Sequence, residues 1–151
     1  MKTVPPKPWF ERPPANLSYG VGGIDFLPTE TIAAEQAGYA GPDWNESWLV
    51  VARETTCGDP IFVDRSQPGF PVLTAMNGMG SWDASPVAPS WEAFLKAIEA
   101  IRPLTVGRQN PVGLEANPLP SKDRDAIEKS LQNLLGSCPF DFWELLLSED
   151  E

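Results

Sequence analysis

Three short apolar segments in the middle of the chain constrain its fold more than any other feature. Residues 48–52 read WLVVA, residues 60–64 read PIFVD, and residues 71–75 read PVLTA. The connections between them are rich in turn residues and too short for a parallel crossover, which needs about a dozen residues or more. The segments therefore predict an antiparallel meander with strands over 48–53, 60–64 and 71–75. The unbroken apolar run at 48–52 predicts a central strand that is covered on both faces.

One more strand and a short helix are expected before this meander. The glycines at 20–23 are followed by IDFL at 24–27, where apolar and polar residues alternate. This pattern is typical of a short strand after a glycine turn. A helix is predicted over 30–37, and Gly38 is placed to end it.

Helices are expected after the meander. Ser90 is a plausible N-cap for a helix over 91–102, because the apolar residues of that segment fall on one helical face. Pro103 is expected to end that helix. Ser121 can cap a last helix whose leucines line one side and which stops at Gly136. The order of strands followed by helices predicts an α+β fold, an antiparallel sheet with helices packed on one face.

The prolines suggest how the chain is organised. Residues 1–18 contain five prolines and are expected to form an extended arm, since proline fixes φ and removes a backbone donor. An α+β core is predicted over 19–103. An irregular connection and C-terminal helices docked on that core follow over 104–151, within a single compact domain.

Trp143 and Leu146 should be buried in the C-terminal segment, because so short an apolar helix is unstable in water by itself. The other side chains predicted to be buried are Trp48, Val50, Phe62, Val72, Phe94, Leu95 and Ile98.

The chain contains no histidine, and this narrows the chemistry available to it. Catalysis by Ser-His-Asp or Cys-His groups is excluded, and the commonest metal ligand is absent. The cysteines, Cys57 and Cys138, lie too far apart in sequence to suggest a metal cluster. Asp25, Asp59 and Asp64 near strand ends leave a carboxylate hydrolase as an alternative. Aspartate at turns is more often structural, so we predict no enzyme, catalytic residue, cofactor or metal.

The charge balance indicates the kind of partner. Eleven basic and 21 acidic residues give a net charge of -10. Such a field disfavours binding to nucleic acid and to anionic membranes, and it favours a basic protein partner. Acidity that only maintains solubility is the alternative. No signal peptide or membrane span is apparent, which leads us to expect a cytoplasmic protein.

A series of fragments resembles the SUKH superfamily, which joins bacterial toxin-immunity proteins to a yeast regulator of cell-wall synthesis. In chain order the fragments are GGIDFLP at 22–28, QAGY at 36–39, WLVVA at 48–52, GDPIFVD at 58–64, PVLTA at 71–75, GMGSW at 78–82 and PVAPSWEAFL at 86–95. The resemblance implies an α+β fold with a curved antiparallel sheet. It also implies an immunity protein that binds and neutralises a cognate toxin. Family members usually begin with a helix, where this chain has its proline-rich arm.

The expected binding residues are acidic and aromatic side chains in loops. Loops carry binding groups on a scaffold that holds them in place, and tryptophan is enriched at binding hot spots. For Trp44 and Trp82, packing in the core is the alternative. An intracellular regulatory scaffold without a toxin partner is the alternative function. The predicted partner-binding residues are Asp43, Trp44, Glu46, Asp59, Trp82 and Asp83.

Overall fold

The computed structural model describes ten stretches of the chain, namely residues 16–18, 22–36, 38–39, 41, 43–55, 58–76, 82–105, 121–136, 138 and 141–147. Within them, six strands form one sheet: β1 (Leu17–Ser18), β2 (Gly23–Phe26), β3 (Trp48–Glu54), β4 (Pro60–Asp64), β5 (Val72–Thr74) and β6 (Ser85–Ala88). The α-helices are α2 (Ile32–Gln36), α3 (Trp91–Ile101), α4 (Ser121–Leu135) and α5 (Asp141–Leu147). Short 3-10 turns, η1 (Thr29–Thr31) and η2 (Arg102–Thr105), precede α2 and follow α3.

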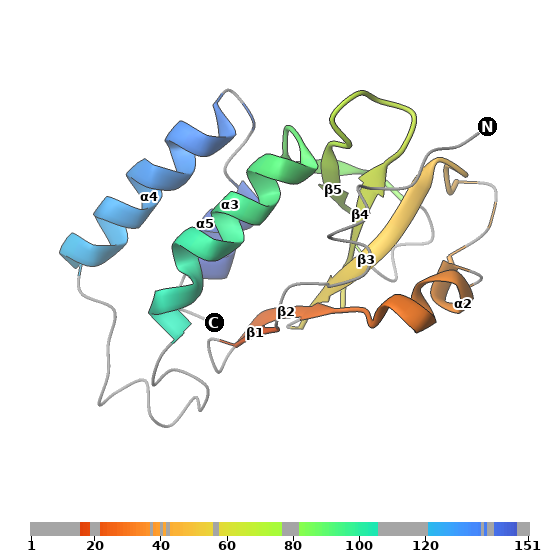
Figure 1. Cartoon of the computed structure of the whole chain (residues 1–151), viewed down its shortest axis with the longest axis horizontal. Helices are drawn as coiled ribbons and strands as arrows, with labels where there is room; N and C mark the ends of the chain where they lie inside the picture. The colour runs from red at the N-terminus through yellow and green to blue at the C-terminus, as the bar shows by residue number, and fades with distance from the viewer. Residues whose placement is uncertain are drawn as a thin grey trace.

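The sheet is an antiparallel meander. Its strands lie in the order β1-β2-β3-β4-β5-β6, and each pairs with the next in antiparallel orientation. The sheet is curved, and α3 and α5 lie against it, with α4 packed on α3 (Figure 1). The predicted α+β fold is therefore confirmed. The strand at 60–64 has the predicted bounds, whereas β3 is one residue longer and β5 two residues shorter than expected.

The central strand β3 is covered on both faces, as its apolar run predicts. Leu49, Val50, Val51 and Ala52 are all buried. The pairing with β4 shifts between Val50 and Ala52, which is the signature of a β-bulge. A bulge changes the alternation of side chains along a strand and increases its local twist, so it contributes to the curvature of the sheet.

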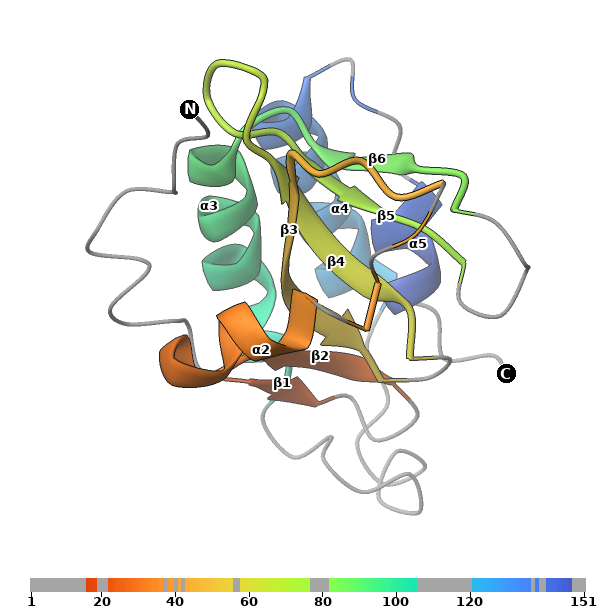
Figure 2. The same ribbon diagram turned by 90° about the vertical axis from the view of Figure 1, so that its right-hand side faces the viewer.

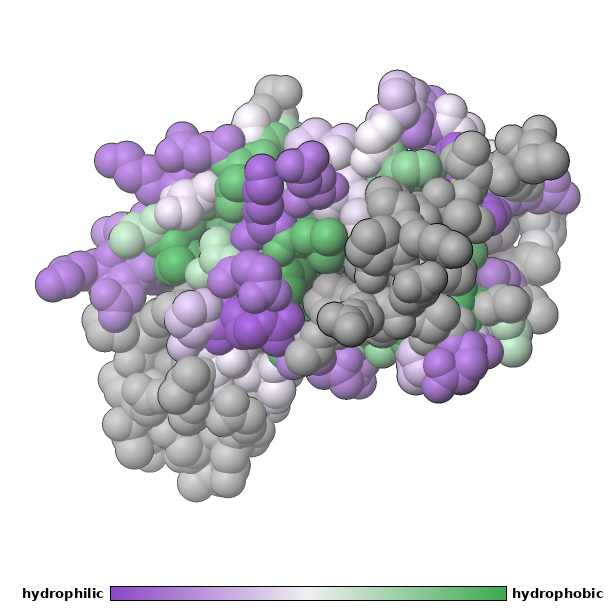
Figure 3. Space-filling model, in the orientation of Figure 1, coloured by the Kyte–Doolittle hydropathy of each residue, from purple (hydrophilic) through white to green (hydrophobic). Residues whose placement is uncertain are grey.

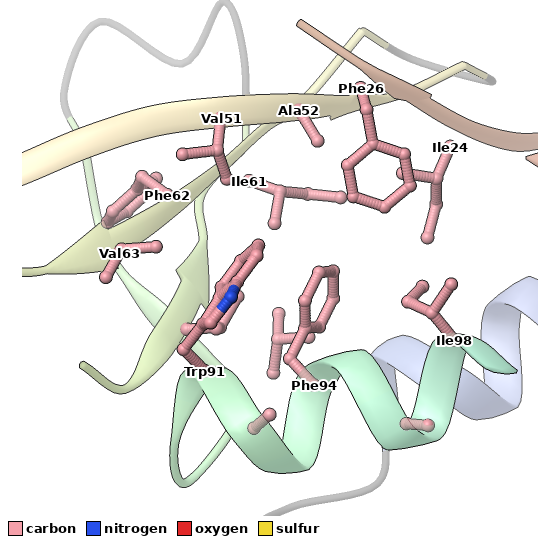
Figure 4. Packing of buried hydrophobic residues seen from close by; sticks show 14 of the residues in the cluster. Ile24, Phe26, Val51, Ala52, Ile61, Phe62, Val63, Trp91, Phe94 and Ile98 are labelled. Atoms are coloured by element: carbon pink, nitrogen blue, oxygen red, sulfur yellow. The ribbon is translucent and has the colours of Figure 1, made fainter. Parts of the chain in front are cut away.

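The main core lies between the sheet and α3. Figure 4 shows Trp91, Phe94 and Ile98 of α3 directed at side chains of β2, β3 and β4. The Phe94 ring lies 6.2 Å from the Phe26 ring, and both side chains are buried. At the start of the helix, the hydroxyl of Ser90 accepts a hydrogen bond of 3.1 Å from the backbone N–H of Ala93, as its predicted capping role requires.

The C-terminal helices pack on this core. In Figure 1, α3 lies between α4 and the sheet, and Leu131 and Leu135 of α4 are buried. The outer surfaces of α3 and α4 are mainly hydrophilic, with apolar side chains visible between the two helices (Figure 3). In α5, Trp143 is buried as predicted, and its indole Nε1 donates a hydrogen bond of 2.8 Å to the Val87 carbonyl oxygen. The side chain of Leu146 lies outside the described part of the structure.

Several local predictions were wrong. Trp48 and Leu95 are only partly buried, because Trp48 begins β3 and Leu95 lies beside the buried stripe of α3. The helix expected over 91–102 ends one residue earlier, at Ile101, and it stops ahead of Pro103 as predicted; the chain then continues through the 3-10 turn η2. Two strands were missed: β1 at the end of the expected arm, and β6 within the expected loop.

Other predictions fall outside the described residues. They concern the arm up to residue 15, the glycine loop at 77–81, Cys57 and the connection at 106–120. Among the helices that are described, none is long and apolar enough to cross a membrane.

Candidate functional site

Aromatic side chains gather on the face of the sheet opposite α3. Ile61 of β4 points toward α3 (Figure 4), so its neighbour Phe62 points to the other side, since successive side chains of a strand alternate. Figure 2 looks onto that other side, where α2 and the segment leading to β3 lie in front of the sheet. We call the cluster found there the aromatic face. Its members are Tyr39, Trp44, Trp48, Phe62 and Trp82.

Trp44 is the centre of the aromatic face, since its ring contacts those of all four other members. Its ring centroid lies 4.9 Å from those of Trp48 and Phe62. It lies 5.2 Å from the stacked ring of Tyr39 and 5.5 Å from Trp82. Aromatic pairs at these separations contribute about 0.5–1.5 kcal/mol each beyond the burial of their surface. The rings therefore hold one another in place.

The aromatic face is anchored in the core but reaches solvent. Phe62 is completely buried beneath it, whereas Tyr39, Trp44, Trp48 and Trp82 are partly buried and pack against the core. Trp44 and Trp82 thus pack against the core, as the core interpretation expects, and keep part of their surface exposed. Amphipathic rings of this kind provide large contact area with few rotatable bonds.

Local turns position these rings. The backbone N–H of Trp44 donates to the Gly41 carbonyl at 3.1 Å, and that of Trp48 donates to the Asn45 carbonyl at 2.9 Å. The Asn45 side chain also accepts from the backbone N–H of Ser47 at 2.8 Å, in an Asx turn. Asparagine stabilises such turns locally, so the segment between the two tryptophans is fixed by its own sequence.

Two arginines near the aromatic face are held by protein groups. Arg53 forms an ion pair with Glu35 and donates to the Tyr39 hydroxyl at 3.3 Å. Arg65 donates to the backbone carbonyls of Glu46 at 2.9 Å and Ser47 at 3.1 Å. Partial burial lowers the pKa of Arg65 and raises the pKa of Tyr39, so the Tyr39 phenol stays neutral at physiological pH.

Three acidic residues flank the aromatic face. Asp43 directly precedes Trp44, Asp83 directly follows Trp82, and Glu46 lies in the turn before β3; all three are exposed. These exposed carboxylates add negative charge within two residues of partly exposed rings. Such a surface suits a cationic group on a partner.

The structure brings two of the six predicted binding residues into direct contact. Trp44 and Trp82 are in ring contact, and Asp43, Glu46 and Asp83 lie beside them in the chain. Asp59 does not join them, because it lies in the β3–β4 turn, where its carbonyl accepts from the backbone N–H of Glu54. Asp59 is therefore not part of the aromatic face, and its role in binding stays a prediction.

Sequence reasoning missed Tyr39 and Trp48 as members of the site. The apolar run that Trp48 begins predicts a core position for it, and no sequence pattern gives Tyr39 a role in binding. The spacing of Trp44 and Trp48, four residues apart across a turn-rich segment, is the signal that could have linked them.

The carboxylates considered for catalysis are spread along the sheet. Asp59 and Asp64 flank β4 at opposite ends, about 16 Å apart at roughly 3.3 Å per strand residue. The Asp64 carboxylate accepts from the backbone N–H and the hydroxyl of Ser66, the usual structural role of aspartate at a turn. Asp25 lies on β2 opposite Arg53. Within the described residues, no group of three or more cysteine or acidic side chains is placed to hold a metal ion.

The chain matches no protein-family model, and comparisons with curated proteins and with solved structures gave no match.

Proposed function

We propose that this protein is a SUKH-type immunity protein that binds a basic surface of a cognate toxin through its aromatic face. The observation that carries the proposal is the aromatic face itself, in which Trp44 and the three partly exposed rings around it lie close in the chain to exposed acids. The ordered fragments that resemble the superfamily and the net charge of -10 support it. The proposal places the encounter in the cytoplasm and requires no catalytic group, cofactor or metal.

The physical argument rests on how protein interfaces gain affinity. A few tryptophan, tyrosine and arginine side chains dominate most interfaces, and they cluster at the centre of the contact. Here the rings are supported from below by buried Phe62 and by the strands β3 and β4. Preorganised rings lose little conformational freedom on binding, and the acidic rim speeds the approach of a basic partner.

A regulatory scaffold with a housekeeping partner could use the same surface, so the partner's identity decides between the two functions. The experiment is to co-purify the full chain with the product of the neighbouring gene. We expect a stable complex with a secreted or contact-delivered toxin. A neighbouring gene without a toxin domain, together with stable capture of a housekeeping protein, would favour the scaffold and contradict the immunity function.

A further inference from the structure

We infer that the aromatic face takes up an arginine side chain of the partner, with the guanidinium packed on the rings of Trp44 and Trp82 and paired with a flanking carboxylate. This inference rests on the proposed function and specifies the chemistry that the partner must present. It is carried by the spacing of the rings, by the position of the acids, and by the ion pair and hydrogen bonds that already engage Arg53 and Arg65.

The spacing of the rings suits a single cation. A cation is attracted to an aromatic ring when it lies over the face of the ring, within about 6 Å of the centroid. The rings of Tyr39, Trp44 and Trp82 contact one another, with centroids 5.2 to 5.6 Å apart, so a cation over the face of one of these rings can also lie within that range of a second centroid. Tryptophan has the strongest attraction of this kind, and two of these three rings are tryptophan.

Two exposed acids lie next to these rings in the chain and can supply the carboxylate partner. Asp43 and Asp83 are exposed and are the immediate chain neighbours of Trp44 and Trp82. Within the described part of the chain, neither carboxylate forms an ion pair. A cation seated on the rings would therefore gain both the ring attraction and a carboxylate partner.

The protein's own nearby arginines are already engaged by other groups. The Arg53 guanidinium contacts Glu35 and the Tyr39 hydroxyl, and the Arg65 guanidinium donates to two backbone carbonyls. Among the residues that the structure describes, Arg53 and Arg65 are therefore not available to the rings of Trp44 and Trp82, and the inferred cation is one that the partner supplies. A second copy of this chain is disfavoured, because two chains of charge -10 repel each other.

Arginine fits this surface better than lysine. Its guanidinium is planar, stacks on aromatic faces, is weakly hydrated and binds carboxylates with two parallel hydrogen bonds. The lysine ammonium is a compact and strongly hydrated point charge, so stacking on a ring costs it more hydration. The surface should thus discriminate between two cations of equal charge.

The test compares two peptides of equal length and charge, acetyl-Gly-Arg-Gly-Arg-Gly-amide and its lysine counterpart, binding to the full chain. Binding is followed by the tryptophan indole N–H resonances of the isotope-labelled protein at an ionic strength of about 0.15 M, where long-range charge effects are screened. We expect the arginine peptide to bind about fivefold more tightly than the lysine peptide and to shift the Trp44 and Trp82 resonances. In the double variant Asp43→Asn, Asp83→Asn, the affinity for the arginine peptide should fall. The matched variant Asp125→Asn, Glu144→Gln, at exposed acids of α4 and α5, should bind as the original does.

Equal affinities for the two peptides would overturn the inference, as would shifts confined to other tryptophans or equal losses in both double variants. Concentration-dependent dimerisation that buries the Trp44 and Trp82 indoles without peptide would assign the surface to a second copy instead. The peptide experiment and the toxin experiment can give different outcomes, so a failure of the inference is distinguishable from a failure of the proposed function. A chain that forms a complex with the toxin but does not distinguish the peptides retains its function and loses the arginine specificity. A chain that prefers the arginine peptide but ignores the toxin has a different basic partner.

Discussion

The side-chain amide of Gln36 pairs with both backbone polar groups of Val50. Its Oε1 accepts from the Val50 N–H at 2.8 Å, and its Nε2 donates to the Val50 carbonyl at 2.9 Å. The same Nε2 also donates to the Ile32 carbonyl at 2.7 Å. β2 ends at Phe26, which pairs with Ala52 of β3. Beyond the end of β2, the Gln36 amide continues the pairing with β3 through Val50. The link fixes the end of α2 and hence the start of the segment that carries Tyr39 and Trp44.

Replacing Gln36 should therefore destabilise the sheet. Gln36→Leu removes the partners of the Val50 N–H and C=O, and an unsatisfied buried polar group costs about 1–3 kcal/mol. We expect the free energy of unfolding, measured by urea titration, to fall by an amount in that range. Glu30→Gln, at an exposed site in η1, is the control and should change it by less than about 0.5 kcal/mol. Equal effects of the two substitutions would show that the amide pairing contributes no stability.

The sequence predicts the centre of the sheet better than its edges. β4 begins at Pro60 and ends at Asp64, where the turn starts, and both residue types favour strand ends and turns. β6 was missed because Pro86 argues against a strand, although proline is compatible with the edge position that β6 occupies. β1 has only two residues and exists through its pairing with β2, which no local pattern encodes.

The candidate site, like the sheet, was predicted only in part, because some of its contacts depend on the tertiary fold. Trp44 and Trp82 were recognised by residue type and by their position in loops. The aromatic face, however, assembles rings from several separate segments, and contacts such as that of Tyr39 with Trp82 depend on the tertiary fold. Asp59 has the same residue type as Asp43, and only the topology places it elsewhere.

Phe94 should be essential for the core. Its ring is fully buried between Phe26, Trp91 and Trp143, with centroid distances of 6.2, 5.2 and 5.9 Å. Phe94→Ala should lower the free energy of unfolding by about 3–5 kcal/mol, because it leaves a cavity as well as removing apolar contacts. Lys96→Ala, on the exposed side of the same helix, should cost less than about 0.5 kcal/mol. A loss for Phe94→Ala no larger than that for Lys96→Ala would contradict the packing described here.

The docking of α5 should contribute to stability through Trp143. Trp143→Phe keeps a ring but removes the donor to the Val87 carbonyl, at a cost of about 1–3 kcal/mol. For a chain of this size each kcal/mol corresponds to a shift in Tm of roughly 2–4 °C. Deleting residues 137–151 should lower Tm further, whereas Glu144→Gln on the exposed side of α5 should leave it unchanged. An unchanged Tm after the deletion would show that α5 does not stabilise the domain.

The rate of association with the toxin should depend on the acids beside the aromatic face. Asp43→Lys together with Glu46→Lys should slow association about tenfold at low ionic strength, and less at high salt, where the charges are screened. The control is Asp125→Lys together with Glu144→Lys. Each reversal adds two positive charges to the net charge of -10, so both double variants have the same net charge of -6. Stopped-flow measurements that find the same slowing for both would show that net charge, and not this surface, steers the partner.

Survival of cells that express the neighbouring toxin gene tests the immunity function most directly. Cells that produce the toxin alone should die, and cells that also produce this chain should grow. The Asp125→Lys, Glu144→Lys variant should protect as the original does, whereas the Asp43→Lys, Glu46→Lys variant should protect less well. If protection is the same for both variants, the immunity function stands and the interface lies elsewhere. If cells die equally with and without the chain, the protein is not the immunity partner of that toxin.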